Sequence, residues 1–217
     1  AASDVYKRQV TDLNTGLVWQ KRSADGLYTW QQAAEYADRL VLGGHDDWRV
    51  PTIKELYSLV LFSGNLRSRT PYIDTHYFDF EYPDTSTGRR LIDAQYWSAT
   101  RYVGRTMRGD ISAFGFNFAD GRIKAYPTGI GGGPTKAACL RCVRGPRGYG
   151  LNDFHDNGDG TITDRATGLM WTKADSGVPL DWRRALEYAE SLECAGYTDW
   201  RIPNAKELQS IVDYTRA

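Results

Sequence analysis

The chain has 217 residues, 41% of them hydrophobic and 25% charged, and its 27 basic side chains equal its 27 acidic ones. That composition is typical of a globular protein with one large or two ordinary domains. No apolar run approaches the roughly 20 residues that a membrane-spanning helix needs. The 7 Trp, 14 Tyr and 22 Gly favour short strands and tight turns over a helical bundle.

The first nine residues do not look like part of a natural domain. Residues 4–9 match the peptide encoded, in one frame, by a transposon-end adapter used in sequencing libraries. We therefore expect residues 1–9 to be non-native and leave them out of the fold prediction, as one would a tag. On that expectation, the absence of a signal peptide says nothing about localisation.

An internal repeat organises the rest of the chain. Residues 10–62 align without a gap with residues 162–214, and 23 of the 53 pairs are identical. A period of about 150 residues indicates tandem domains and not a solenoid. We predict a complete domain over residues 10–147 that lacks its first hairpin strand, and the N-terminal half of a second copy over residues 148–217.

The first copy reads as two helices followed by strands. Thr29 is the expected N-cap of a helix that ends at Gly43-Gly44. Its predicted apolar face comprises Trp30, Ala33, Ala34, Ala37 and Leu40. Thr52 and Glu55 form a capping-box pattern that begins a second helix. The apolar side of that helix comprises Ile53, Leu56, Leu59 and Val60.

Four strands are expected after the second helix. They cover residues 95–100, 112–119, 122–126 and 139–144, and Asp120-Gly121 forms a hairpin turn between the second and third. Residues 63–92 and 126–136 are long loops rich in Gly, Pro, Asp and Thr. Long loops on a compact scaffold usually carry function.

The second copy opens with a hairpin signal. Asn157-Gly158-Asp159-Gly160 is a turn before a strand over residues 161–164, and a further turn leads into residues 169–171. Asp181 is the expected cap of its first helix. Read as an EF-hand loop, this stretch would place His155 at position 1 and Ala166 at position 12, where carboxylates are required. We therefore predict a hairpin turn here and no metal site.

Several motifs in fixed order resemble the C-terminal domain family of the Legionella collagen-like adhesin. The second copy supplies residues 156–161, 167–171, 199–203 and 206–208, and the first copy supplies residues 48–52, 96–100, 116–121 and 141–145. The structural residues of these motifs are Trp19, Trp48, Arg49, Pro51, Glu55, Trp97, Asn117, Asp120, Gly121, Cys142, Trp171, Trp200, Arg201, Pro203 and Glu207.

The resemblance implies an α+β, C-type-lectin-like fold shared with the formylglycine-generating sulfatase modifiers. Two helices would flank small, twisted antiparallel sheets, with a long loop region for ligands. Family members are bacterial, exported, and often repeated, and the best-known one binds sulfated glycosaminoglycans. The resemblance therefore implies an extracellular, cell-surface or periplasmic location. Fold-level analogy alone remains a weak warrant for function.

Trp48, Trp97 and Arg49 allow two interpretations. The tryptophans could form a platform on which a sugar stacks. Alternatively, each is buried with its indole N–H on a backbone partner, and Arg49 pairs with an acid. The occurrence of the Trp48-Arg49 motif in both copies fits either interpretation.

The three cysteines are Cys139, Cys142 and Cys194. On a strand, Cys139 and Cys142 would point to opposite faces, which disfavours a mutual disulfide. No second CxxC accompanies them, so a zinc site is unsupported. In the family, a Cys in the first helix often accompanies the one at the position of Cys142, and the first copy has none there. Cys194 could pair within the half that the second copy lacks.

Charge placement is the most informative feature for function. Residues 101–147 contain nine Arg and Lys against two Asp, an excess of +7, which leaves −7 on the remainder. Such asymmetry points to a polyanion-binding face, and the guanidinium fork suits sulfate and carboxylate. The alternative is that these charges pair with the acidic first half. The candidate ligand-binding residues are Arg101, Tyr102, Arg105, Arg108, Arg122, Lys124 and Lys136.

Catalysis has little support. The three His lie beside no Ser or Cys nucleophile motif, and Gly131-Gly132-Gly133-Pro134 lacks the Lys-Ser/Thr of a phosphate-binding loop. We expect a non-catalytic adhesion module for sulfated or acidic polysaccharide or a host-surface ligand, with no cofactor, no metal and no nucleic-acid partner. A protein-interaction or structural repeat is the main alternative, and an enzyme related to the sulfatase modifiers is the third. The sequence leaves the oligomeric state open.

Overall fold

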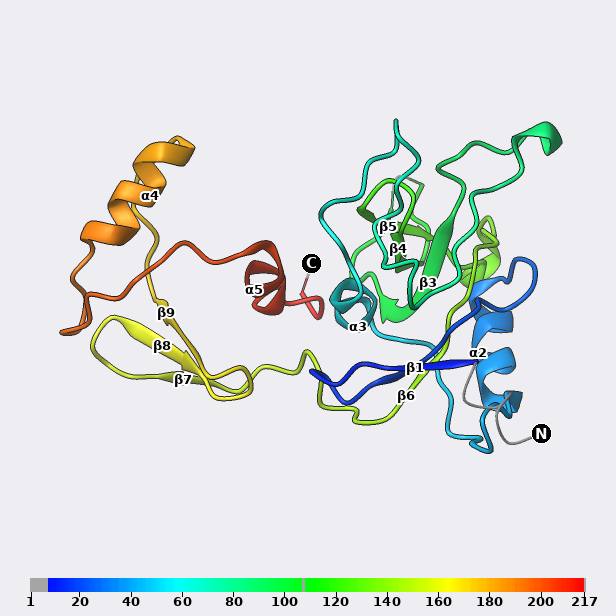
Figure 1. Ribbon diagram of the computed structural model, residues 1–217, viewed down its shortest axis with the longest axis horizontal. Coiled ribbons are helices and arrows are strands. Elements are labelled where there is room, and N and C mark those ends of the chain that lie inside the picture. Colours follow the sequence, from blue (N-terminus) through cyan, green and yellow to red (C-terminus); the bar gives the residue numbers. More distant parts are fainter. Residues whose placement is uncertain (1–7, 107, 217) are drawn as a thin grey trace. The chain divides into compact units, whose positions relative to one another are not determined.

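The computed structural model describes residues 8–106 and 108–216, and so most of the predicted non-native segment lies outside the described residues. The described residues form two compact units: unit 1, with residues 8–149 and 213–216, and unit 2, with residues 150–212. Both combine short helices with small antiparallel sheets (Figure 1). The chain is therefore α+β, as predicted.

Unit 1 contains the two predicted helices, α2 (Trp30–Arg39) and α3 (Ile53–Ser58). Thr29 and Thr52 cap them, each with a complete capping box. Short 3₁₀ turns at Thr85–Thr87 and Ile130–Gly132 interrupt the two long loops. No helix among the described residues is long and apolar enough to cross a membrane.

Two details of the first helix differ from the prediction. The helix ends at Leu40, whose backbone is extended, and not at Gly43-Gly44. The two glycines adopt positive φ in a tight turn further on, closed by hydrogen bonds between Leu42 and His45. The predicted apolar face is also too wide, because Ala34 is exposed while Ala33 and Ala37, four residues apart, are buried.

Two three-stranded antiparallel sheets complete unit 1. One has the order β1 (Gln9–Thr11), β2 (Val18–Gln20), β6 (Val143–Arg144). The other has the order β3 (Gln95–Arg101), β4 (Ser112–Asn117), β5 (Arg122–Pro127). The β4–β5 hairpin turns at Asp120-Gly121 as predicted, with Gly121 at φ 73°.

The predicted strand over residues 139–144 is wrong in extent, since only Val143–Arg144 forms a strand. Ala138 bridges to Tyr28 and Cys139 to Tyr96, whereas Val143 pairs with Trp19 of β2. The segment thus passes from β3 of one sheet to β2 of the other. A chain that changes partner in this way cannot maintain one continuous ladder.

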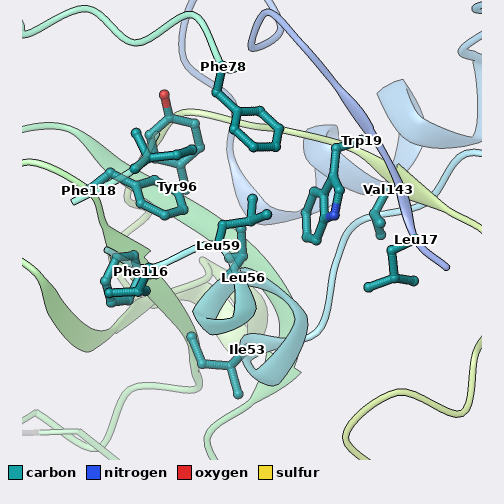
Figure 2. Packing of buried hydrophobic residues seen from close by; sticks show 12 residues of the cluster. Leu17, Trp19, Ile53, Leu56, Leu59, Phe78, Tyr96, Phe116, Phe118 and Val143 are labelled. Carbon is teal, nitrogen blue, oxygen red and sulfur yellow. The ribbon is translucent and has the colours of Figure 1, made fainter. Parts of the chain in front are cut away.

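The core of unit 1 lies on both faces of the β3–β4–β5 sheet. Figure 2 shows the first cluster, in which Ile53 and Leu56 of α3 lie beside Phe116 of β4, with Trp19 and Val143 from the other sheet. The second cluster packs Ala33 and Ala37 of α2 with Trp97, Leu140 and Cys142, among others. Both helices therefore depend on the strands of the later half for burial.

Unit 2 repeats the earlier half alone. Its sheet has the order β7 (Phe154–Asp156), β8 (Thr161–Asp164), β9 (Leu169–Thr172), followed by α4 (Trp182–Ser191) and α5 (Ala205–Ser210). The predicted hairpin turn at residues 157–160 is confirmed. Its Asp159 carboxylate accepts hydrogen bonds from the Thr161 backbone N–H at 3.0 Å and hydroxyl at 2.6 Å. The equivalent of β7 in the first copy would fall at residues 2–4, outside the described residues.

Candidate functional site

The candidate site is built on the loop that joins β3 to β4. Arg101 is the last residue of β3, and the Tyr102 N–H donates to the carbonyl of Ser112, the first residue of β4, at 2.9 Å. Within the loop, the Thr106 N–H donates to the Asp110 carbonyl at 3.2 Å, and the Thr106 and Ser112 hydroxyls lie 2.8 Å apart. The loop is therefore held at its base, where it leaves and rejoins the sheet.

Three exposed arginines project from this loop: Arg101, Arg105 and Arg108. Arg105 donates to the Gly109 carbonyl at 3.3 Å, and none of the three forms an ion pair with a described acid. The loop carries one carboxylate, Asp110, against these three positive charges. Because the guanidinium groups are not neutralised by partners, they are free to attract an anion.

Tyr102 anchors the loop. Its ring stands edge-on to the ring of Phe114, with centroids 5.5 Å apart and planes at 85°. The side chain is half-buried, and a Cβ on Gly104 would lie 3.2 Å from the ring. Tyr102 therefore attaches the start of the loop to β4.

The sheet register separates the remaining predicted residues into two groups. Arg101 pairs with Ala113, and Ala113 with Tyr126, whose ring lies 5.6 Å from the Lys136 ammonium. Lys136 is therefore at the same end of the sheet as the arginine loop. Arg122 pairs with Asn117 at the other end of β5, about 14 Å along the strand from Tyr126.

Lys124 lies between these ends, and its ammonium is 2.9 Å from the Asp120 carboxylate. Arg144 is likewise paired, with its Nε 2.6 Å from Asp47 Oδ1, and this pair holds the pKa of Asp47 below its usual value. Of these two pairs, only Arg144–Asp47 joins the basic stretch to the first half, as the alternative interpretation of the charges proposed. Among the described residues of this stretch, the three loop arginines, Lys136, Arg122, Arg141 and Arg147 form no ion pair.

Arg141 is fully buried and serves as an internal clamp. Its guanidinium donates to the carbonyls of Gln20 at 2.6 Å and Asp79 at 2.7 Å, and its Cζ lies 5.1 Å and 5.8 Å from the ring centroids of Phe78 and Tyr96. The charge excess of residues 101–147, from which a basic face was predicted, includes Arg141. Its position between Leu140 and Cys142 in an apolar stretch was the available signal that it points inward.

The structural interpretation of Trp48 and Trp97 is confirmed, and their use as an exposed stacking platform is wrong. The two side chains are 3% and 0% exposed. Their indole N–H groups donate to the carbonyls of Leu42 at 3.1 Å and Tyr28 at 2.8 Å, respectively. Their rings are buried in the core, so they cannot stack against a sugar.

The prediction that Arg49 pairs with an acid is also confirmed. Arg49 makes a two-point ion pair with Glu55, and Glu55 in turn accepts the Thr52 N–H at 2.7 Å. The same carboxylate therefore caps α3 and fixes the guanidinium. Unit 2 repeats this geometry between Arg201 and Glu207, whose carboxylate accepts the Asn204 N–H at 2.8 Å.

All three cysteines are described, and all three are free thiols. Burial raises the pKa of Cys142 to about 12 and also raises that of Cys139. Both thiols are therefore protonated at neutral pH and poorly reactive. Their behaviour in the structure is that of core residues.

An open depression lies beside α2. This open depression of about 520 Å³ is lined by Tyr28, Glu35, Tyr36 and Arg39, among others. Glu35 and Arg39 form an ion pair of 3.7 Å. None of the predicted basic residues borders this depression.

Comparison with known proteins identifies the family. The Lcl C-terminal domain model matches residues 8–144 and again residues 160–217. The two matches follow the internal repeat, and together they span most of the chain. No curated protein matches this sequence. The chain therefore belongs to the Lcl C-terminal domain family, whose name ties it to surface and adhesin-related proteins.

Proposed function

We propose that this chain is a non-catalytic, exported binding module that captures sulfated or acidic polysaccharide through Arg101, Arg105 and Arg108. The observation that carries the proposal is the loop of residues 101–111. It presents three exposed guanidinium groups without ion-pair partners on a base held by hydrogen bonds. Arg105 and Arg108 in particular are exposed, so packing of the core does not require a basic side chain at either position.

The chemistry of arginine supports an oxyanion ligand. Each guanidinium can donate two parallel hydrogen bonds to one sulfate or carboxylate, which gives geometric selectivity as well as attraction. A single exposed charge pair contributes little, so several contacts along one polymer are needed. Lys136 extends the positive patch at the same end of the sheet, and Arg122 offers a more distant contact for a long chain.

The proposal extends to fold type and location. Two helices and small antiparallel sheets support a C-type-lectin-like architecture, and the adhesin-related family supports an extracellular, cell-surface or periplasmic site. The ligand is then a host or cell-surface polysaccharide, bound without cofactor. Nucleic acid, also a polyanion, is the less fitting ligand for an exported protein.

Heparin binding across a salt series tests the proposal. We expect saturable binding that weakens as salt rises, because each contact between a guanidinium and a sulfate or carboxylate of heparin releases counterions. Replacing Arg101, Arg105 and Arg108 together with Ala is expected to abolish it. The matched control replaces three exposed arginines of unit 2, Arg165, Arg183 and Arg184, and loses the same net charge. Equal loss in both variants, or no binding at low salt, contradicts the assignment of the site.

One observation favours a protein-interaction module as the second candidate. Unit 2 leaves large apolar side chains exposed, including Trp182 at 73% and Leu208 at 49%. Exposed large apolar side chains favour contacts with other polypeptides over contacts with polyanions.

A further inference from the structure

Unit 2 exposes residues that unit 1 buries. Leu208 and Val212 are 49% and 39% exposed, whereas their counterparts at an offset of 152, Leu56 and Val60, are 0% and 2% exposed. The residue types at these positions are identical in the two copies. Their apolar character is thus maintained in unit 2, although nothing among the described residues buries them to the same extent.

Unit 1 shows what covers this surface. The indole N–H of Trp30 donates to the Ser98 carbonyl of β3 at 2.9 Å. Val143 exchanges backbone hydrogen bonds of 2.9 Å and 3.0 Å with Arg49, and it also pairs with Trp19 of β2. The β-rich stretch of residues 94–147 therefore supplies the strands that cover this surface. The preceding loop adds Ile73 and Phe78 to the cluster that contains Leu56 and Val60.

The sheets differ in the same way. In unit 1, β2 lies between β1 and β6, so both of its edges are paired. Its counterpart in unit 2, β9, is an edge strand that pairs with β8 alone among the described strands. An unpaired edge of this kind is a template for another strand.

Charge complementarity identifies the kind of strand that fits. Residues 150–212 contain six basic and eleven acidic side chains, a net charge of −5, whereas residues 94–147 contain nine basic and two acidic ones, a net charge of +7. In unit 1 this difference becomes a direct contact, because Arg144 of β6 pairs with Asp47 at 2.6 Å. The counterpart of Asp47 in unit 2 is Asp199, which is exposed.

We infer that unit 2 is a docking surface for a basic, β-rich polypeptide segment with the chemistry of residues 94–147. The segment adds an antiparallel strand to β9 and covers the apolar side of α4 and α5. By the register of β2 with β6, the residue equivalent to Val143 lies opposite Trp171, and the next lies opposite Met170. The arginine equivalent to Arg144 then reaches Asp199.

Two other occupants fit less well. A second copy of this chain cannot donate its own residues 94–147 without exposing the core of its unit 1. An anionic bilayer would be repelled by the net charge of −5 on unit 2. Both remain distinguishable outcomes of the experiment.

The test uses the full chain and a separately produced segment of residues 92–147 fused to a soluble carrier. We expect one-to-one binding that is weakened at least tenfold by Leu208→Asp with Trp182→Ala. Glu190→Ala, on an exposed position of α4, is the matched control and should bind as the unaltered chain does. Binding that persists in the double variant means that the segment has exchanged into unit 1, and this overturns the inference.

A second experiment does not depend on folding of the isolated segment. In a chimera, an extra copy of residues 63–147 follows residue 216 of the full chain. We expect the backbone amides of β9 to exchange with solvent at least tenfold more slowly than in the original chain, and Asp199→Asn to reduce this protection. Unchanged exchange in the chimera overturns the inference. Self-association of the original chain, or its binding to vesicles that contain phosphatidylserine, with no effect in the chimera, does the same.

Discussion

The start of α3 in unit 1 and the start of α5 in unit 2 have the same local geometry in different surroundings. In both, an arginine and a glutamate six residues later form a two-point ion pair, and the glutamate completes a capping box. The arginine and glutamate side chains are 15% and 1% exposed in unit 1 but 60% and 17% exposed in unit 2. Local sequence thus determines the shape, whereas a remote segment supplies the burial.

This difference has energetic consequences that matched substitutions can measure. A contact that is identical in geometry should contribute much more to stability where water is excluded than where it is not. The two copies therefore serve as internal controls for each other when one position is changed in both.

The largest difference is expected for the ion pair. Glu55→Ala leaves Arg49 mostly buried without its partner, which costs about 3–5 kcal/mol of unfolding free energy. Glu207→Ala breaks the exposed equivalent and should cost about 0–1 kcal/mol beyond the shared loss of the cap. Urea unfolding of unit 1 and amide exchange of α5 measure the two values. Equal losses would show that burial does not govern this contact.

A smaller contrast is expected for the leucines. Leu56→Ala removes a fully buried side chain and should destabilise unit 1 by about 2–5 kcal/mol. Leu208 is 49% exposed, so Leu208→Ala should cost less than about 1 kcal/mol. The same two measurements apply. A large loss at Leu208 would mean that unit 2 is already covered in solution.

Removing the helix caps should cost the same stability in both copies, because capping is local. Thr52→Ala and Asn204→Ala each remove a side-chain acceptor for backbone N–H groups. We expect both to cost about 1 kcal/mol, within the usual range of 0.5–2. The helicity change on substitution, followed by circular dichroism, checks this. A marked difference between the copies would contradict the view that the helix starts are encoded locally.

The last prediction concerns pH and applies to unit 1 only. The pKa of Cys142 is raised by burial to about 12, whereas an unfolded thiol has a pKa near 8.5. The neutral thiol therefore stabilises the fold below about pH 8.5, and this contribution is lost as pH rises toward 12. Between pH 9 and 11, we expect Cys142→Ala to lose stability with pH less steeply than the unaltered chain. Parallel slopes would count against the buried thiol as the cause.

The sequence predicted the local features well because each has a local cause. The caps at Thr29 and Thr52, the turn at Asp120-Gly121 and the hairpin turn of the second copy depend on residues within four positions of one another. The repeat and the family followed from motifs in fixed order. What the sequence could not indicate was the limit of the strand over residues 139–144, because that limit arises where the segment changes partner between sheets.

The candidate site was predicted less completely, for the same reason. The sequence identified the basic stretch but could not separate Arg101 and Arg108, which are exposed, from Arg141, which is buried. Nor could it place Arg122 at the far end of the sheet from Arg101, since that follows from the register of three strands. The charge of a surface depends on which charged side chains point outward as well as on how many the sequence contains, and tertiary structure sets where each side chain points.

The clamp formed by Arg141 bears on how the domain is made. The carbonyl of Gln20 that accepts its hydrogen bond lies 121 residues earlier in the chain. At a synthesis rate of about 5–20 residues per second, on the order of 10 s pass on the ribosome between the synthesis of Gln20 and that of Arg141. During that interval the two helices of the first half are present without the strands that bury them, which is the condition that unit 2 displays.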